Sequence, residues 1–600
     1  MPEKQNRVTP SRFRVVAVPL LVAVLAGLIV GGVAGSVMTL RTVRQNFIGF
    51  TTDSLLLGVY LVVIYGLVSM GAGAVIGAFF AIVAARGRDV GPREVFAGAL
   101  GVLFAVYLFL TGMRLYNTDI YFYQYPFIRS YQVMQLFFVL RSALLVPIVL
   151  AAGYIVYRLS RRAPGRVIAA LALIVIAAGV VVSLRSTRPP RETTTEPPAL
   201  VPDASIPKIM LVGWDGATWV VIDRLLAAGK MPHTRRLIER GTRGNLKSPA
   251  RTASPEIWTT IYTGKVGRKH GIYGFAYYIL PGLKRPLVPP WRGLGVTRLI
   301  TLALEHRWVD MVIANRSLRR ATPIWRIMNG AGKSAGVVGA LATWPAEETE
   351  PFLISSVAGD VARKVRKGKL TRGAFEAEDL FYPLELEESV RQAILADERW
   401  RESVGPYLYR KHYPDFFTIY FGEPDGTQHT RWKWMEPQYY ADVTEEDLAR
   451  YGGQIEHEYV RADSVLGMLL ETAGDSTTVL VVSDHGFSPA YRGGIHQAGH
   501  YYGPNGILIA CGPPILPGAP VENAHVNDIT PTLLALAGLP VAEDMDGRVL
   551  DEIIRPEFLH RHPVTTTPTY ETEASAKEVR QSQAEDELYE KLRALGYIGE

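Results

Sequence analysis

Five long apolar runs dominate the first third of the chain and constrain its fold more than any other feature. Few or no charged residues interrupt them, and they cover residues 16–40, about 54–85, 94–115, 134–157 and 166–184. A helix needs roughly 20 apolar residues to cross the hydrocarbon core of a bilayer, and all five runs are near or above that length. We therefore predict a transmembrane region of about five helices over residues 1–185, embedded in a lipid bilayer.

Two details of these runs leave alternatives. The first run is long for a signal peptide, and no small-residue cleavage pattern follows it, so we favour a retained span. The second run is long enough to tilt or to break, and Gly71, Gly73 and Gly77 make a break there plausible.

Basic residues between the apolar runs predict the orientation. With five spans, three clusters fall on one side of the membrane, and the positive-inside rule makes that side cytoplasmic. The clusters are Lys4, Arg7, Arg12 and Arg14; Arg86, Arg88 and Arg93; and Arg158, Arg161, Arg162 and Arg166. Arg41, Arg44, Arg185, Arg188 and Arg191 oppose this assignment without reversing it. We expect a multi-pass cell-membrane protein with its N-terminus in the cytoplasm and the residues after 185 outside it.

The same arginines argue against a nucleic-acid partner. The formal net charge is +7, but many arginines lie in short loops between apolar runs and do not form a basic stripe. The single cysteine, Cys511, excludes a disulfide within the chain, and its apolar neighbours indicate a buried, unreactive thiol.

A Pro- and Thr-rich linker, residues 186–205, separates the membrane region from a soluble domain over 206–555. Short apolar runs that end in polar turns predict strands there, at 209–214, 334–339, 416–421 and 478–483, with a helical period over 220–240. Strands alternating with helices predict an α/β domain with a mainly parallel central sheet. Sites in such sheets gather beyond the carboxyl ends of the strands.

Acids and histidines follow these predicted strands. Asp215 ends the first strand, Asp425 and His429 follow the third, and Asp484 and His485 follow the fourth, with His496 and His500 ahead of a later apolar run. Oxygen and imidazole ligands without thiolate suit Zn²⁺, with Mn²⁺ as a harder alternative. Three Asp and three His are enough for two ions, which together suit in-line phosphoryl or sulfuryl transfer.

A nucleophile is expected near the first acid. Ser254 precedes Pro255, and if Ser254 begins a helix, the helix amides favour a bound phosphate. The structural alternative is that Ser254 is an N-cap. Thr252 is a second candidate for the reacting hydroxyl.

The motif order resembles the alkaline phosphatase superfamily, and within it the type I phosphodiesterase/nucleotide pyrophosphatase branch. The resemblance covers about 206–550 and rests on Asp215-Gly216, Ser254-Pro255, Thr263-Gly264, His270-Gly271-Ile272, Asp425 with His429, Asp484-His485-Gly486, His500 before the run 506–513, Asn527–Leu534 and Asp544–Gly547.

The resemblance implies a division of labour among these residues. Asp425, His429 and His500 would hold one metal, with His496 as an alternative to His500. Asp215, Asp484 and His485 would hold the other, with the Ser254 oxygen beside it. Metal-bound Ser254 would attack phosphorus to give a covalent phospho-enzyme, which metal-activated water then releases. Thr is often the nucleophile in this branch, so Ser254 is a departure, and no sulfatase motif surrounds it. His270 is expected to close a turn.

Two insertions, near 276–322 and 360–450, are expected to form caps that select a substrate, and Trp432 and Trp434 either stack on a base or pack within the cap. Residues 556–600 read as a polar tail, with a loose connector over 565–590 and a short helix over 585–597. The expected function is hydrolysis of a phosphodiester or pyrophosphate in a phosphorylated small molecule, nucleotide or lipid head group. The alternatives are a phospho-head-group transferase acting on lipid or glycan, and a degenerate membrane sensor. The sequence leaves the oligomeric state open.

Overall fold

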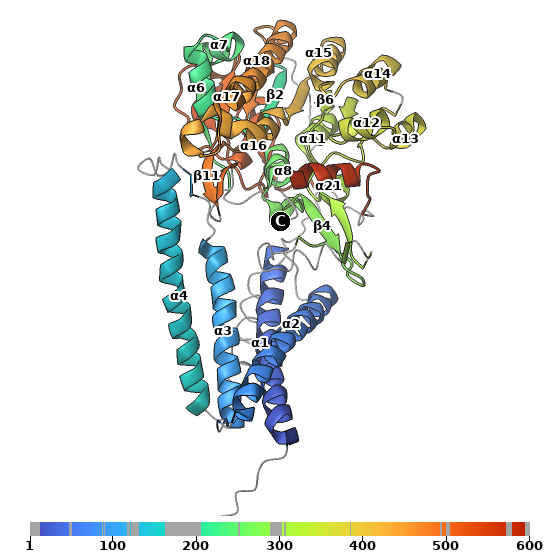
Figure 1. Ribbon diagram of the computed structural model, residues 1–600. Coiled ribbons are helices and arrows are strands. Elements are labelled where there is room, and N and C mark those ends of the chain that lie inside the picture. Colours follow the sequence, from blue (N-terminus) through green and yellow to red (C-terminus); the bar gives the residue numbers. More distant parts are fainter. Residues whose placement is uncertain are drawn as a thin grey trace, which may run out of the picture. The chain divides into compact units, whose positions relative to one another are not determined.

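A computed structural model of the chain describes residues 12–46, 51–86, 88, 90–116, 120–121, 131–162, 206–249, 253–288, 303–304, 306, 308–384, 386–492, 495–499, 505–571 and 579–594. The chain divides into two compact units (Figure 1). The first contains residues 1–118, 135–189 and 278–310, and the second contains residues 119–134, 190–277 and 311–600.

Long helices make up most of the described part of the first unit. They are α1 (Arg12–Gln45), α2 (Thr52–Ala85), α3 (Pro92–Tyr116) and α4 (Tyr131–Arg162). Among the described residues, Val15–Arg44 and Thr52–Ala85 are long and apolar enough to cross a membrane, which by itself is weak evidence of membrane association. The fifth predicted span, 166–184, and the linker 186–205 lie outside the described residues, so the five-span topology stays a prediction.

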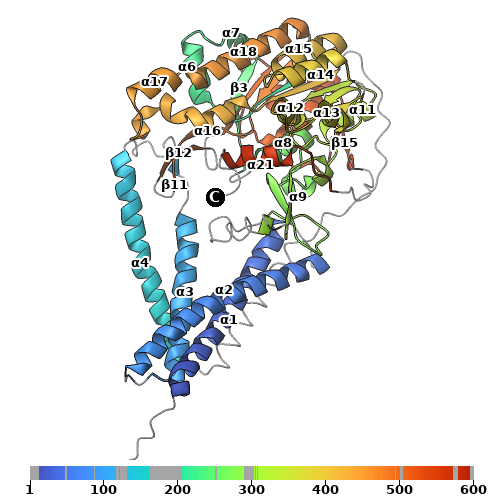
Figure 2. The same cartoon turned by 45° about the vertical axis from the view of Figure 1, so that its right-hand side comes forward.

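Glycines bring the backbones of α1 and α2 into direct contact, and Figure 2 shows the two helices crossing side by side. A Cβ atom on Gly31 would lie 2.3 Å from the Tyr65 carbonyl oxygen, and one on Gly73 would lie 2.4 Å from the Ala23 carbonyl oxygen. Lipid tails are as apolar as the side chains of such helices, so the hydrophobic effect does not drive two helices together within a bilayer. Close backbone approach at small residues stabilises the pair through van der Waals contacts instead. Of the two alternatives for the second run, a break does not occur: α2 is continuous, and Gly73 and Gly77 lie against the backbone of α1.

Residues 278–288, here called the 278–288 segment, fold onto the end of the helix pair where α1 stops and α2 starts. The Asn46 side chain accepts a hydrogen bond from Val288 N (2.6 Å) and donates one to Val288 O (2.8 Å), as a neighbouring β-strand would. Asp53 Oδ2 accepts from Lys284 N at 3.2 Å. Leu283 and Leu287 are buried in one apolar cluster with residues of both helices, namely Met38, Val43, Leu57, Leu61 and Tyr65.

We expect Asn46→Ala to loosen the 278–288 segment in the full-length chain. The change leaves the Val288 peptide group without these two hydrogen bonds, and about 1.4 kcal/mol of lost stabilisation raises the population of an opened segment about tenfold. Trypsin cleavage after the exposed Lys284 should accelerate by about that factor. Ser36→Ala is the matched control, because among the described residues the Ser36 hydroxyl bonds only within α1, to Gly32 O. Equal cleavage rates in Asn46→Ala and the control would contradict this role of Asn46.

The second unit is built on an eight-stranded sheet. Its order is β3 (Thr242–Leu246), β13 (Gly506–Cys511), β10 (Thr478–Val482), β2 (Ile209–Trp214), β9 (Phe416–Phe421), β6 (Ala335–Val338), β7 (Pro351–Ile354), β8 (Phe381–Tyr382). The strands from β10 to β7 pair in parallel, whereas β3, β13 and β8 pair antiparallel at the two edges. The sheet is therefore mixed, and the prediction of a mainly parallel sheet holds for its centre only.

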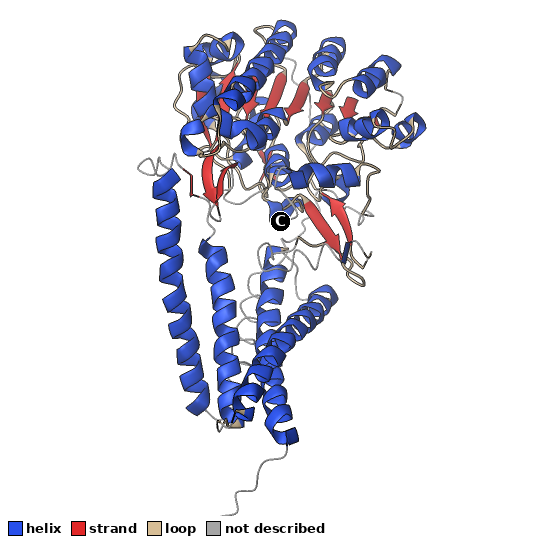
Figure 3. Cartoon of the chain, viewed as in Figure 1, coloured by secondary structure: helices blue, strands red, loops and turns tan. Residues whose placement is uncertain are grey.

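Helices cover both faces of this sheet (Figure 3). Along β2, Met210, Val212 and Trp214 enter one apolar cluster while Ile209 and Leu211 enter another, as the two-residue period of a strand requires. The helices are α6 (Trp219–Ala227), α7 (Pro232–Arg240), α8 (Ser254–Thr263), α9 (Gly267–His270), α11 (Ile324–Gly330), α12 (Ala358–Arg366), α13 (Arg372–Ala377), α14 (Glu388–Ala396), α15 (Arg401–His412), α16 (Glu423–Met435), α17 (Glu445–Tyr451), α18 (Gln454–Ala473), α19 (Ile529–Leu536), α20 (Pro556–Arg561) and α21 (Glu585–Ala594).

Three smaller sheets complete the described strands. They pair β1 (Ile120–Tyr121) with β11 (Ser488–Arg492) and β12 (Ile495–Gly499), β14 (Val541–Ala542) with β15 (Thr566–Thr567), and β4 (Ala276–Ile279) with β5 (Asp310–Ile313). The helical period over 220–240 is divided between α6 and α7, because Gly229 adopts a positive φ and Pro232 starts a new helix.

Two segments, residues 360–450 and the described part of 565–590, pack against the α/β core more closely than their composition indicates. The range 360–450 includes the central strand β9, and residues of α12, α14 and α15 pack in the apolar core of one sheet face. The terminal helix α21 lies against α12, where Lys364 Nζ and Asp586 Oδ1 are 2.6 Å apart. Ala584, just before α21, is fully buried. Within residues 565–590, those that the structure describes are thus attached to the α/β core.

Candidate functional site

Three acids meet at the carboxyl ends of three adjacent parallel strands. Asp215 directly follows β2, Asp484 comes two residues after β10, and Asp425 lies in the first turn of α16, just after β9. Because β10, β2 and β9 are neighbours in register, their carboxyl ends share one edge of the sheet. All three side chains are buried.

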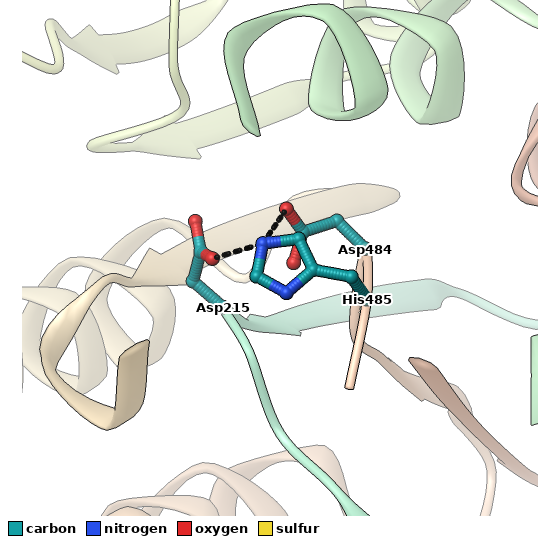
Figure 4. Close-up of side chains that lie close together, drawn as sticks. All are labelled: Asp215, Asp484 and His485. Atoms are coloured by element: carbon teal, nitrogen blue, oxygen red, sulfur yellow. Dashed lines mark ion pairs between the residues drawn. The ribbon is translucent and has the colours of Figure 1, made fainter. Parts of the chain in front are cut away.

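Asp215, Asp484 and His485 form a compact cluster (Figure 4). Each offers one ligand atom, and these atoms lie within 4.8 Å of one another. His485 Nε2 is 3.2 Å from Asp484 Oδ2 and 3.5 Å from Asp215 Oδ1. His485 Nδ1 donates to Gly486 O at 3.2 Å, which turns Nε2 toward the acids. Metal-binding histidines are commonly oriented in this way.

The electrostatics of the cluster favour a bound cation. Burial, and then the charges of Asp484 and Asp425, raise the pKa of Asp215 well above its usual value. Burial, and then the charge of Asp425, raise the pKa of Asp484 to about 8. Asp215 Oδ1 and Asp484 Oδ2 are buried and accept no hydrogen bond from the residues that the structure describes. Buried carboxylates normally need such partners, and a divalent ion would provide one, so this donor set fits a metal.

Ser254 faces this cluster from the start of α8. It is the first helical residue, with Ala253 at the N-cap position, so the N-cap interpretation of Ser254 is wrong. Its side chain is 3% exposed, and Oγ lies 3.3 Å from His485 Nε2. Thr252 lies outside the described residues, so the choice between the two hydroxyls stays a prediction.

Asp425 and His429 form a second pair on α16. They are four residues apart on the helix, with His429 Nε2 3.5 Å from Asp425 Oδ2. Burial lowers the pKa of His429 and favours the neutral imidazole that ligates metals. His500 and the side chain of His496 lie outside the described residues, so the third ligand of this pair is untested.

The turn after β2 holds the two groups of residues close together. Gly216 has φ +67°, and a Cβ there would lie 2.9 Å from the Asp425 Cβ. Gln428 Nε2 donates to Gly216 O at 2.9 Å, and the Tyr459 hydroxyl donates to Gln428 Oε1 at 2.9 Å. Gly216 N in turn donates to Asp484 Oδ1 at 3.2 Å. Only a glycine allows this approach in this backbone conformation, so the Asp-Gly motif has a structural reason.

Sequence reasoning missed two aromatic residues of the site, Trp258 and Tyr420. Trp258 Nε1 and the Tyr420 hydroxyl both donate to Asp215 Oδ2, at 3.1 and 2.5 Å. Both residues occur in apolar runs and look like ordinary core positions. The one available signal was that Trp258 follows Ser254 by four residues, and so lies on the same helix face.

Other residues singled out by the sequence have structural roles. His270 Nδ1 accepts from Ile272 N at 3.1 Å, as expected for a residue that closes a turn, and burial lowers its pKa to about 3. Trp432 is 1% exposed and donates to Glu436 Oε2 at 3.0 Å. Trp434 stacks on Tyr451 with ring centroids 4.4 Å apart. These contacts favour packing over base stacking for both tryptophans.

Comparison with known proteins identifies a matching protein family. The family model described as "Type I phosphodiesterase / nucleotide pyrophosphatase" matches residues 209–509, about half of the chain. A 2,3-bisphosphoglycerate-independent phosphoglycerate mutase from Laribacter hongkongensis is 36% identical over 76 residues, which span 13% of this chain and 15% of that protein.

Solved structures with weaker likeness include two enzymes. One is an inactive form of murine ectonucleotide pyrophosphatase/phosphodiesterase 5 in complex with AMP, with 14% identity, a TM-score of 0.35, and coverage of 58% of this chain and 100% of that one. The other is phosphonoacetate hydrolase from Sinorhizobium meliloti 1021 in complex with phosphonoformate, with 21% identity, a TM-score of 0.29, and coverage of 49% and 61%.

Proposed function

Because the chain belongs to the type I phosphodiesterase/nucleotide pyrophosphatase family, we propose that it is a phosphoester hydrolase. The proposed enzyme is membrane-anchored and extracytoplasmic, uses two metals, and cleaves phosphodiester or pyrophosphate bonds through a covalent phosphoserine. The observation that carries the proposal is the buried Asp215–Asp484–His485 cluster with the Ser254 hydroxyl 3.3 Å from His485 Nε2.

The residues of the site suit two divalent ions. Asp215, Asp484 and His485 would hold one, and Asp425, His429 and His500 the other, with Zn²⁺ as the expected metal and Mn²⁺ as the alternative. Bound ions would offset the negative charge on the phosphoryl oxygens of the substrate.

Ser254 and α8 carry the proposed steps. The positive end of the α8 dipole, where Ser254 lies, would favour the negatively charged phosphoryl group. Ser254 Oγ would bond to phosphorus as its proton passes to water, while the opposite P–O bond breaks and the leaving oxygen takes its electron pair and a proton from water. A second water would then attack phosphorus, break the Ser254 Oγ–P bond and return the serine hydroxyl. The net reaction consumes one water per ester cleaved.

The first unit supports a membrane anchor with a defined sidedness. The basic residues Arg86 and Arg88 lie between α2 and α3, and Arg93 lies in the first turn of α3. Arg161 pairs with Glu94 at 2.8 Å, which joins the end of α4 to the start of α3. The 278–288 segment contacts the opposite end of the α1–α2 pair. If the basic end faces the cytoplasm, the 278–288 segment is on the outer side of the membrane. The catalytic strands, which precede and follow this segment in sequence, would then also be outside the cytoplasm.

Metal removal tests the proposed chemistry in the purified full-length protein. We expect chelation to lower hydrolysis of bis-p-nitrophenyl phosphate at least about 100-fold, because charge stabilisation by the ions would be lost, and Zn²⁺ or Mn²⁺ to restore it. Diesters and nucleotide pyrophosphates should be cleaved faster than p-nitrophenyl phosphate. Full activity in chelator would refute the two-metal proposal. Product found on an added lipid or glycan acceptor, and not in water, would favour the transferase alternative.

A further inference from the structure

The two oxygens of Asp215 have different surroundings. Oδ1 points to His485, at 3.5 Å from Nε2, and accepts no hydrogen bond from the described residues. Oδ2 accepts two hydrogen bonds, from Trp258 Nε1 and from the Tyr420 hydroxyl. A carboxylate with both donors on one oxygen is held in one rotamer, with the other oxygen directed at the cluster.

Trp258 links this carboxylate to the proposed nucleophile. Ser254 and Trp258 are four residues apart on α8, hence on one face of the helix, and both are buried. The Trp258 indole lies over Gly213 in β2, where a Cβ would come within 2.5 Å of the indole ring. Glycine at 213 therefore leaves room for the indole to reach Asp215, two residues further on. The register of α8 against β2 is fixed at this point.

Tyr420 links the same carboxylate to the second pair of ligands. It lies on β9, five residues before Asp425, and is 7% exposed. Its ring contacts the Trp258 ring edge to face, with centroids 5.2 Å apart at 82°. The two donors therefore support each other as well as Asp215.

We propose that Trp258 and Tyr420 are positioning residues that fix the Asp215 carboxylate for metal binding and, through it, set the place of Ser254 relative to the ions. The inference rests on the proposed two-metal function. Asp215 Oδ2 is the point where α8, which carries Ser254, meets β9, which leads to Asp425. Loss of either donor would leave Asp215 Oδ2 held by the other donor alone, and the ions would be held less tightly.

Tyr262 provides a matched control for simple aromatic packing. It lies one turn after Trp258 on α8, is 2% exposed, and its ring contacts Trp258 with centroids 5.7 Å apart. Its hydroxyl is buried and, unlike Trp258 Nε1 and the Tyr420 hydroxyl, does not donate to Asp215 in the part of the chain that the structure describes. Tyr262→Phe thus removes a buried hydroxyl from the same aromatic group without touching Asp215.

The experiment measures metal affinity in metal-stripped full-length protein by competition with a fluorescent zinc chelator, with no substrate present. We expect Tyr420→Phe and Trp258→Phe each to weaken Zn²⁺ binding by about 10- to 100-fold, and Tyr262→Phe to leave it unchanged. Because both donors act on one oxygen, the double variant should lose less than the product of the single losses. The thermal midpoint of metal-free Tyr420→Phe should stay close to that of Tyr262→Phe.

Each outcome decides between the proposals. Zn²⁺ bound normally by Tyr420→Phe would overturn the positioning role, as would equal weakening in Tyr262→Phe, since general loosening of the aromatic group would then explain both. If Trp258→Phe does not fold, Tyr420→Phe decides alone, because it removes one oxygen atom. A wild-type protein that binds no divalent ion would overturn the proposed function itself and not merely this inference.

Discussion

Ser254→Ala is expected to lower the turnover of a diester substrate by at least about 10³-fold, because the proposed nucleophile is absent while the rest of the site is intact. The substituted side chain is small and lies at the first position of α8, so the fold should not change. Steady-state kinetics on bis-p-nitrophenyl phosphate measure the loss. Mass spectrometry of wild-type enzyme acid-quenched during turnover of this diester should find a p-nitrophenylphosphoryl group on the peptide that contains Ser254.

Thr252→Ala is the control, because Thr252 is the other candidate hydroxyl. It should retain turnover within a few fold and leave the phosphopeptide unchanged. The opposite pattern, with activity lost on changing Thr252 and kept on changing Ser254, would transfer the nucleophile to Thr252. Zn²⁺ binding should survive in Ser254→Ala, since Asp215, Asp484 and His485 are still in place.

Asp484→Asn is expected to abolish turnover and yet stabilise the metal-free protein at neutral pH. The pKa of Asp484 is about 8 in the folded chain, against an ordinary value of 3.8. A raised carboxyl pKa means that the folded state binds the proton more tightly than the unfolded state, so metal-free stability falls as the pH rises from about 4 to about 8. Asn cannot ionise, and its amide oxygen can still accept from Gly216 N.

Thermal unfolding in chelator between pH 4 and pH 8 measures this effect. The wild-type midpoint should fall with pH more steeply than that of Asp484→Asn, and about 1 kcal/mol of relieved repulsion corresponds to roughly 2 °C or more. With excess Zn²⁺ the order should reverse, because only the wild type binds the ion fully. If the midpoints of wild type and Asp484→Asn change in parallel with pH in chelator, ionisation of Asp484 does not destabilise the metal-free protein.

Asp463 supplies the contrasting control. It is also a buried acid, at 2% exposure, but its oxygens accept from Thr234 N (2.7 Å), Thr234 Oγ1 (2.6 Å) and His233 N (3.2 Å). Its charge is already stabilised by donors, so Asp463→Asn should lower the midpoint both with and without metal.

The candidate ligands were predictable from the sequence because each is tied to a local pattern. Asp215, Asp425 and Asp484 follow apolar runs that form β2, β9 and β10, and polar residues directly after buried strands are rarely core positions. That these strands are neighbours, however, is decided by the sheet order, which joins residues more than 200 positions apart in sequence. The antiparallel edges of the sheet were missed for the same reason.

The sequence by itself determined the long apolar runs, the central strands β2, β6, β9 and β10 and the order of Asp and His motifs, because hydrophobic period and turn residues act over a few positions. Only the tertiary structure decided which distant side chains contact and orient the residues of those motifs and of the helix ends. Tyr420 reaches Asp215 across 205 positions, and Asn46 reaches Val288 across 242. A tyrosine in an apolar strand, or an asparagine at a helix end, has the same local pattern whether or not it has such a partner. Its role follows from packing, and packing brings together residues that the order of the chain keeps apart.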